Sequence, residues 1–336
     1  MPTLHAAVAA LVFQLGPSAA GQTWDLPVLQ RFLGFTENEW QQVDRGTVVA
    51  RTLRATDGRE FAVVSAVRSA ASSACFIAQF QDIEKFKKSP LVLEVRRFSD
   101  PPVMEDLASM MLDGKDVAGL SACQSGNCSV RLPAEAMELI HRGEADRHTA
   151  FRRWLLSYVQ AFKGQGNAAL VAYHDKSQPV RLADELSALL NAKPSLADLA
   201  PEVYSYLARY PAAPLPGAAS EFSYWSRENF GLRAVVSVTH ASVHRQPGQA
   251  IIATKQIYAN HYFDGSLGLT FLIDVPGASP EAVYVVYLNR SRIDLLSGVL
   301  GGLRRLILRG RLLEGYKENL REMVKRLDSS CGAGKN

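Results

Sequence analysis

The sequence predicts an α+β fold, in which a curved antiparallel sheet is closed by a long C-terminal helix and interrupted by a mainly helical insertion. Three observations carry this prediction. Strand-like runs fill residues 233–244, 250–274 and 282–291 near the end of the chain. A helical pattern then extends from about residue 294 to 327. Residues from about 103 to 216 have mainly helical periodicity, which places the insertion before the strands.

Length and composition indicate an ordinary globular protein. The chain has 336 residues, of which 47% are hydrophobic and 21% charged, so it can bury a large core. Its net charge of +4 is too small to indicate a nucleic-acid-binding protein, which usually carries a dense basic face. The body of the chain contains no apolar run long enough for a membrane-spanning helix.

The first twenty residues have the layout of a secretory signal peptide. Residues 6–15 are apolar, Gly16-Pro17 ends this run, and the small residues Ser18, Ala19 and Ala20 precede Gly21. The segment before the apolar run lacks Lys and Arg, which departs from the usual pattern. A buried N-terminal helix is the alternative. We expect residues 1–20 to be removed and the protein to be exported to the periplasm or secreted.

The cysteines agree with export. Cys123 and Cys128 flank a turn-like segment, and we expect them to form a local disulfide in an oxidising compartment. No second Cys/His pair at a familiar spacing accompanies them, so we predict no metal site there. Cys75 is expected to be a small core residue, and Cys331 to have no packing role in a tail of residues 328–336.

The first third of the chain predicts a short helix, a hairpin and a second helix. In the N-terminal segment of residues 21–45, apolar spacing predicts a helix over residues 26–43. Residues 47–55 and 60–69 form strand-like runs joined through Asp57-Gly58, a strong hairpin signal. Residues 72–87 have helical spacing, with Ser72 or Ser73 as the N-cap.

The insertion is predicted to be a set of helices within one domain that spans residues 46–327. The candidate helices are residues 104–112, 133–140, 145–162, 183–190 and 196–210, and a strand-like run interrupts them at 168–173. Residues 210–217 contain three prolines, which oppose helix formation, and we interpret them as a connector.

This order of elements resembles the START-like superfamily, also called the Bet v 1-like or helix-grip fold. Residues 60–69 (EFAVVSAVRS), followed by AASSACFIAQFQDIEKF, look like the opening strand and helix of that family. Residues 294–327 look like its closing helix. The resemblance implies a cavity between the sheet and the C-terminal helix that holds a lipid or another hydrophobic molecule.

Aromatic and histidine side chains are dense where this cavity is expected. Apolar walls with a few hydroxyl or imidazole groups suit a lipid-like ligand, although ordinary strand propensity selects the same residues. The candidate ligand-binding residues are Tyr224, Trp225, His240, His244, Tyr258, His261, Tyr262 and Tyr284.

The histidines raise an enzymatic alternative. His240 and His244 are four apart on a strand and therefore share a face with Val236 and Val238, and His261 lies on the next strand-like run. Three such histidines can hold a metal, or one can act as a base beside Tyr258 or Tyr262. We favour structural histidines, hydrogen-bonded on the sheet face or meeting solvent, and we predict neither a metal site nor a cofactor nor an assigned catalytic residue.

The first half of the C-terminal helix is basic and amphipathic. Arg304, Arg305, Arg309 and Arg311 lie close together with no acid among them. Such a helix docks on an anionic membrane surface, or packs on the sheet while the arginine side chains extend to water. We expect sheet packing, with peripheral membrane contact as a compatible second role.

Taken together, these observations predict an exported protein that binds a lipid or another hydrophobic small molecule. The first alternative is an enzyme on the same scaffold, a cyclase or hydrolase that uses the strand-borne histidines and tyrosines. The second alternative is an accessory protein of the cell envelope that docks on a membrane surface.

Overall fold

The computed structural model describes residues 26–55, 57–143, 146–214, 216–230, 232–278, 281–296 and 301–331, without the side chains of residues 301–309. The predicted signal peptide, residues 1–20, lies outside these ranges. Within them, no helix combines the length and apolar character needed to cross a membrane.

The centre of the molecule is an eight-stranded sheet that is antiparallel throughout. Its spatial order is β1 (Val49–Thr52), β2 (Glu60–Ser69), β10 (Val283–Ile293), β9 (Phe263–Asp274), β8 (Gln249–Ala259), β7 (Val235–Gln246), β6 (Ala218–Glu228) and β3 (Val92–Arg97). The predicted hairpin of β1 and β2 is confirmed, whereas β3 and β6 were not predicted. The α+β class predicted from the sequence is confirmed.

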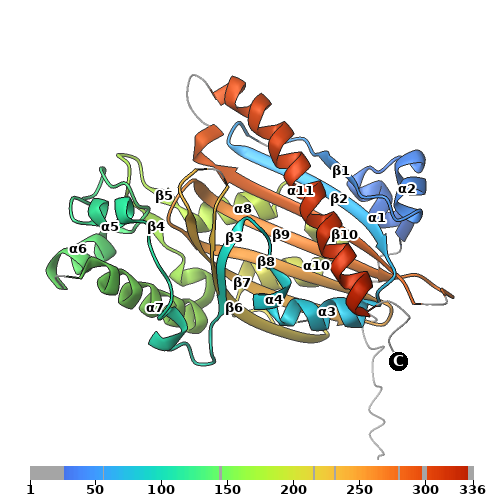
Figure 1. The fold of residues 1–336 in the computed structure, drawn as a ribbon, viewed down its shortest axis with the longest axis horizontal. Coiled ribbons are helices and arrows are strands. Elements are labelled where there is room, and N and C mark those ends of the chain that lie inside the picture. The colour runs from blue at the N-terminus through green and yellow to red at the C-terminus, as the bar shows by residue number, and fades with distance from the viewer. Residues whose placement is uncertain are drawn as a thin grey trace, which may run out of the picture.

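Helices cover both faces of this sheet (Figure 1). On one face lie α3 (Ser73–Gln81), α4 (Ile83–Phe86) and the long C-terminal helix α11 (Gly301–Cys331), which follows the short η3 (Asp294–Leu296). We call this the α11 face. The opposite face, the insertion face, carries α1 (Leu26–Leu33), α2 (Glu37–Asp44) and the insertion. The insertion contains η1 (Met104–Leu107), α5 (Gly114–Leu120), α6 (Ala134–Gly143), α7 (Arg147–Gln165), η2 (Gly166–Ala169), β4 (Ala172–Tyr173), β5 (Val180–Arg181), α8 (Leu182–Leu190), α9 (Leu196–Leu199) and α10 (Pro201–Arg209).

Strand alternation divides the core into two layers. In β7, Val236 and Val238 pack against the insertion, whereas Ala241 and Val243 pack against the α11 face. Successive strand residues point to opposite sides of a sheet, so each strand contributes to both layers. An eight-stranded sheet covered by helices on both faces can therefore bury nearly all of its central strands.

The α11 face is closed by apolar packing beneath the described half of α11. Leu320, Val324 and Leu327 lie in one buried cluster with residues of α3 and of the central strands, such as Phe76 and Leu272. The cavity predicted between the sheet and the C-terminal helix is therefore filled by side chains at this end. For the first half of α11 that cavity stays a prediction, because the side chains there lie outside the description.

Several predicted helices are divided in the structure. The helix predicted over residues 26–43 is α1 and α2, because Gly34 adopts a positive φ of 69° and Thr36 starts a new helix with a capping box. Residues 72–87 form α3 and α4, and Ser72 caps α3 by accepting from the Cys75 N–H. Residues 196–210 divide at Ala200 because Pro201 begins α10.

The strand-like run of residues 250–274 is also divided. It forms β8 and β9, and the turn between them contains Asn260, His261 and Tyr262. Tyr262 has a φ of 61°, in the left-handed region, which reverses the chain. The expectation that His261 lies on a strand was therefore wrong.

Two disulfides join the four cysteines. The predicted Cys123–Cys128 pair is confirmed, with Cα atoms 4.4 Å apart. Cys75 and Cys331, separated by 256 positions, form the second pair. The expectations that Cys75 is a free core residue and that Cys331 has no packing role were wrong, because α11 extends to Cys331 and ends beside α3.

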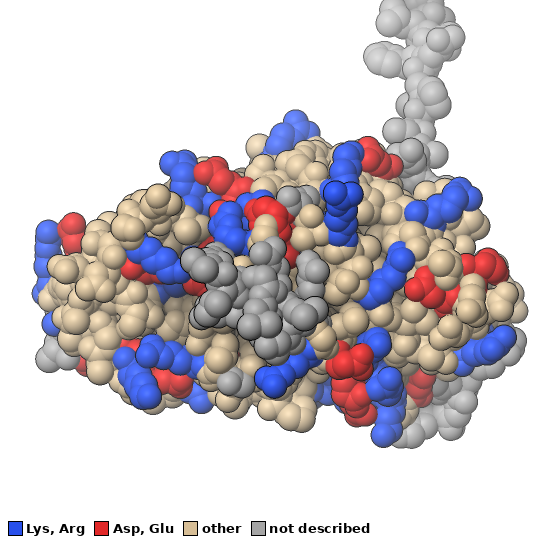
Figure 2. Space-filling model, turned by 90° about the horizontal axis from the view of Figure 1, so that it is seen from above, with Lys and Arg blue, Asp and Glu red and all other residues tan. Residues whose placement is uncertain are grey.

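Charged side chains of both signs are mixed on the surface. On the face seen in Figure 2, Lys and Arg side chains are interspersed with Asp and Glu side chains. This face lacks a continuous basic patch among its described residues, which is the arrangement that a net charge of +4 leads us to expect.

Candidate functional site

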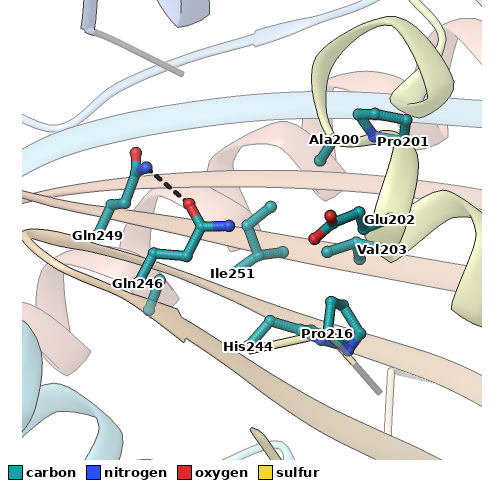
Figure 3. Close-up of a pocket in the computed structure, with 10 residues that line it drawn as sticks. Ala200, Pro201, Glu202, Val203, Pro216, His244, Gln246, Gln249 and Ile251 are labelled. Atoms are coloured by element: carbon teal, nitrogen blue, oxygen red, sulfur yellow. Dashed lines mark hydrogen bonds between the residues drawn. The ribbon is translucent and has the colours of Figure 1, made fainter. Parts of the chain in front are cut away.

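A cavity of about 190 Å³ lies on the insertion face, where the β7–β8 hairpin meets α10 (Figure 3). Its position follows from local sequence. Pro247 and Gly248, the latter with a φ of 73°, turn the chain between β7 and β8, and Pro201 fixes the first turn of α10. The lining residues are Ala200, Pro201, Glu202, Val203, Pro216, His244, Gln246, Gln249, Ala250 and Ile251.

Most of this lining is apolar, and its polar groups come from three directions. Gln249 donates an Nε2 hydrogen bond of 2.9 Å to Oε1 of Gln246 across the hairpin, which leaves the Gln246 amide nitrogen facing the cavity (Figure 3). The Glu202 carboxylate points inward from α10. Since Pro201 and Glu202 are exposed, the cavity lies at the molecular surface.

His244 forms the inner polar wall of the cavity. Its ring is 4% exposed, Nε2 is 2.8 Å from Oγ of Ser242, and the ring centroid is 5.3 Å from that of Tyr206. Burial lowers the pKa of His244 to about 4. The imidazole is therefore neutral at pH 7, so it offers one donor and one acceptor and no charge.

A hydrogen-bonded cluster around Glu221, whose side chain is 39% exposed, lies next to this wall. The Glu221 carboxylate accepts hydrogen bonds from the hydroxyls of Tyr206 and Tyr210 and from Nε2 of His240, the last at 3.3 Å. Burial opposes ionisation of Glu221, yet these bonds from His240 and Tyr206 lower its pKa to about 2. Burial lowers the pKa of His240, so we assign it as a neutral donor to a carboxylate.

Lys255 is the most unusual member of this cluster. It is 3% exposed, donates a 2.6 Å hydrogen bond to Oδ1 of Asn167, and lies 5.0 and 5.2 Å from the ring centroids of Tyr210 and Phe162. Burial lowers its pKa to about 7, although Glu221 acts in the opposite sense. A buried amine that titrates near neutrality is the kind of group that catalytic sites use, but neither Lys255 nor His240 lines the cavity.

The predicted ligand-binding residues are divided between the two faces of the sheet. Tyr224 packs on the α11 face, whereas its neighbour Trp225 packs on the insertion face and donates to the Asp106 carbonyl at 2.8 Å. Consecutive strand residues point in opposite directions, so these two cannot line one cavity. Tyr284 donates to Oδ1 of Asp44 near α2.

The other predicted residues have separate structural partners. The Tyr258 hydroxyl is buried and donates to the Arg131 carbonyl at 2.9 Å. His261 contacts Asp116 at 2.9 Å in a different buried cluster, and the Tyr262 hydroxyl accepts from the Arg233 N–H. Of the eight predicted residues, His240 and His244 lie together beside Tyr206, on the shared face that their spacing predicted. The sequence neighbours His261 and Tyr262 have ring centroids 5.4 Å apart, away from the cavity.

The enzymatic alternative depended on a histidine base beside one of two predicted tyrosines, and the structure gives the histidines other tyrosine neighbours. His240 and His244 lie beside Tyr206 and Tyr210 and not beside the predicted Tyr258 or Tyr262. In the part of the chain that the structure describes, no three His, Cys, Asp or Glu side chains are arranged to hold a metal ion. Sequence reasoning missed Glu221 and Lys255, although a lysine inside the apolar run AIIATKQIYA was a usable signal.

The predicted membrane-facing arginines lie mostly outside the description. The side chains of Arg304, Arg305 and Arg309 belong to the undescribed part of α11, and Arg311 is exposed. Their membrane role stays a prediction.

Comparisons with known proteins do not assign the chain. No family model matches it, and no curated protein has a significant match to its sequence.

Proposed function

We propose that this protein binds a small, largely apolar molecule in the cavity between β7, β8 and α10. The observation that carries the proposal is the cavity itself, with apolar walls and a few convergent polar groups. Its volume of about 190 Å³ is below the range of roughly 300–1,000 Å³ for drug-sized ligands. The cavity therefore suits a small molecule, or one end of a longer one such as a lipid chain.

The arrangement favours binding over catalysis. The groups with strongly shifted pKa values, Glu221 and Lys255, are held behind the lining by bonds to other protein atoms. A general base must reach the substrate within hydrogen-bond distance, either directly or through one water. His244 does line the cavity, but its pKa of about 4 makes it a weak base at neutral pH.

Ligand-observed NMR with cyclohexanol as the probe tests the proposal. Saturation transfer from the protein to the probe is expected for the unmodified chain. Ile251→Phe places a larger side chain in the cavity and should abolish the transfer, whereas Leu139→Phe, at a side chain 59% exposed on α6, should not. Absence of transfer to the unmodified protein, or equal transfer to both variants, would contradict the proposal.

We also propose that the protein acts after export from the cytoplasm. Two disulfides support this, because such bonds persist in oxidising compartments and are rare in the cytosol. The layout of residues 1–20 supports it independently. N-terminal sequencing of the protein recovered from its native host should begin at Gly21, and a chain that still begins at Met1 would count against export.

A second proposed role is contact with an anionic membrane surface. Phe230 and Leu232, 43% and 53% exposed, lie in the β6–β7 turn, and the Phe230 ring is 6.0 Å from that of Phe263. Phe263 and Leu312 of α11 pack against the same small apolar cluster, and the exposed Arg311 precedes Leu312. Vesicles containing phosphatidylglycerol should co-sediment the protein, and the double variant Phe230→Ser/Leu232→Ser should weaken this. Equal sedimentation with Leu139→Ser and the double variant would remove the role.

A further inference from the structure

We propose that the ligand of this cavity carries an ammonium group, which pairs with Glu202 while its apolar part contacts the walls. The inference rests on the function proposed above, and it adds the charge of the ligand. It depends on three observations, namely the charges in the lining, the direction of the Glu202 side chain and the neutrality of His244.

Glu202 is the single charged side chain among the lining residues that the structure describes. Gln246 and Gln249 are neutral amides, and neither Lys nor Arg takes part in the lining. The nearby Glu221 already accepts three hydrogen bonds and adds a second negative charge behind the wall. A carboxylate or phosphate ligand would therefore enter a cavity of its own sign, whereas a cation would be attracted.

Glu202 lies at the start of α10. It is the second residue of the helix, where a carboxylate interacts favourably with the N-terminal end of the helix dipole. Figure 3 shows its carboxylate directed toward Ile251 and Gln246. The described residues provide no ion-pair partner for it, so the charge is free to meet a ligand.

The Glu202 carboxylate and the apolar walls suit an amine that also has an apolar body. An ammonium group has three donors and no acceptor, and the acceptor that faces it is the Glu202 carboxylate, since Oε1 of Gln246 already accepts from Gln249. Pro201, Val203, Pro216 and Ile251 offer apolar contact but no hydrogen-bonding side chain. The cavity is therefore matched to a small amphiphilic amine.

Three probes with the same ring and different head groups test the inference on the full chain. Dissociation constants for cyclohexylamine, cyclohexanol and cyclohexanecarboxylate are measured by NMR titration at pH 7.5 and low salt. We expect cyclohexylamine to bind about twofold to fivefold more tightly than cyclohexanol, as expected for one exposed ion pair. Cyclohexanecarboxylate should bind most weakly.

Glu202→Gln tests the charge alone, because it removes the negative charge and keeps a side chain of similar size in the lining. This variant should bind cyclohexylamine and cyclohexanol equally well, and high salt should reduce the difference in the unmodified protein. Glu135→Gln is the matched control, because Glu135 is also an exposed second residue of a helix, in α6, and should leave the ratio unchanged.

The outcomes distinguish the two proposals. If none of the probes binds, the proposed function fails. If cyclohexanol or cyclohexanecarboxylate binds as tightly as cyclohexylamine, or if Glu202→Gln preserves the preference, the binding function stands and the ammonium inference is overturned.

Discussion

The two faces of the sheet are built from different chemistry. The α11 face is mainly apolar, with one partly buried ion pair, Lys87–Glu228, and is closed by a helix whose end is joined to α3 through Cys75–Cys331. The insertion face has a larger apolar core, but it also buries the Arg290–Glu60 pair and Lys255, and it carries the Glu221 cluster and the cavity. Apolar packing needs no matching partners, whereas buried charges do. The candidate site and most of the buried charge therefore lie on the insertion face.

The largest expected effect concerns the buried pair on the insertion face. Arg290 and Glu60 are 3% and 0% exposed and form an ion pair. Arg290→Met leaves the carboxylate buried beside an apolar side chain, which should reduce the free energy of unfolding by about 3–5 kcal/mol in urea titrations. Arg96→Met is the control, since its pair with Glu84 is exposed and should be worth less than about 1 kcal/mol.

A second substitution sharpens this test. Adding Glu60→Leu to Arg290→Met removes both charges and should recover much of the lost stability, because an apolar pair often replaces a buried ion pair at little cost. An Arg290→Met loss as small as that of Arg96→Met would show that the insertion face does not depend on its buried charges.

On the α11 face, the expected largest effect is that of the long-range disulfide. Cys75→Ser/Cys331→Ser opens a link between positions 256 apart and should lower the free energy of unfolding by about 2–4 kcal/mol. Cys123→Ser/Cys128→Ser opens a link of only five positions and should cost less. Hydrogen exchange near Leu320 and Leu327 should accelerate in the first variant alone. Equal losses would contradict the idea that the first bond fastens α11.

The sequence predicted features that depend on neighbouring residues and missed those that depend on distant ones. Local patterns predicted the β1–β2 hairpin, a cap at Ser72 or Ser73 and the Cys123–Cys128 pair, because each depends on residues close together in the sequence. The Cys75–Cys331 pair was missed because its partners meet only after the whole sheet has formed. β3 was missed because Glu94, Arg96 and Arg97 make this edge strand too polar for a strand pattern.

The candidate site was the least predictable part. The shared face of His240 and His244 followed from strand spacing alone. The partners of these histidines come from α10 and β6, through Tyr206 and Glu221, and no local pattern reports which helix of an insertion covers which strand. His261 was misplaced because one residue with positive φ, Tyr262, turned a predicted strand into a tight turn.

The smallest expected effect concerns Lys255, and it has the opposite sign to the others. Its pKa of about 7 in the folded protein lies below the ordinary value of about 10.4 for lysine. Between these two pH values the unfolded chain binds more protons than the folded one, so this group makes stability rise with pH. Below pH 7 the buried ammonium lowers stability in full, although the Tyr210 and Phe162 rings offset part of the cost.

Lys255→Met should therefore stabilise the protein, by about 1–2 kcal/mol at pH 6.5 and by progressively less toward pH 10. Water can replace the lost bond at Asn167, which is only half-buried. Lys325→Met, at an exposed position of α11, should leave stability unchanged at both pH values. If Lys255→Met is less stable than the unmodified chain at pH 6.5, the ammonium is a structural element of the insertion face. A gain in stability would mean that the insertion face keeps a destabilising amine near its cavity. Functional sites often reduce stability in this way.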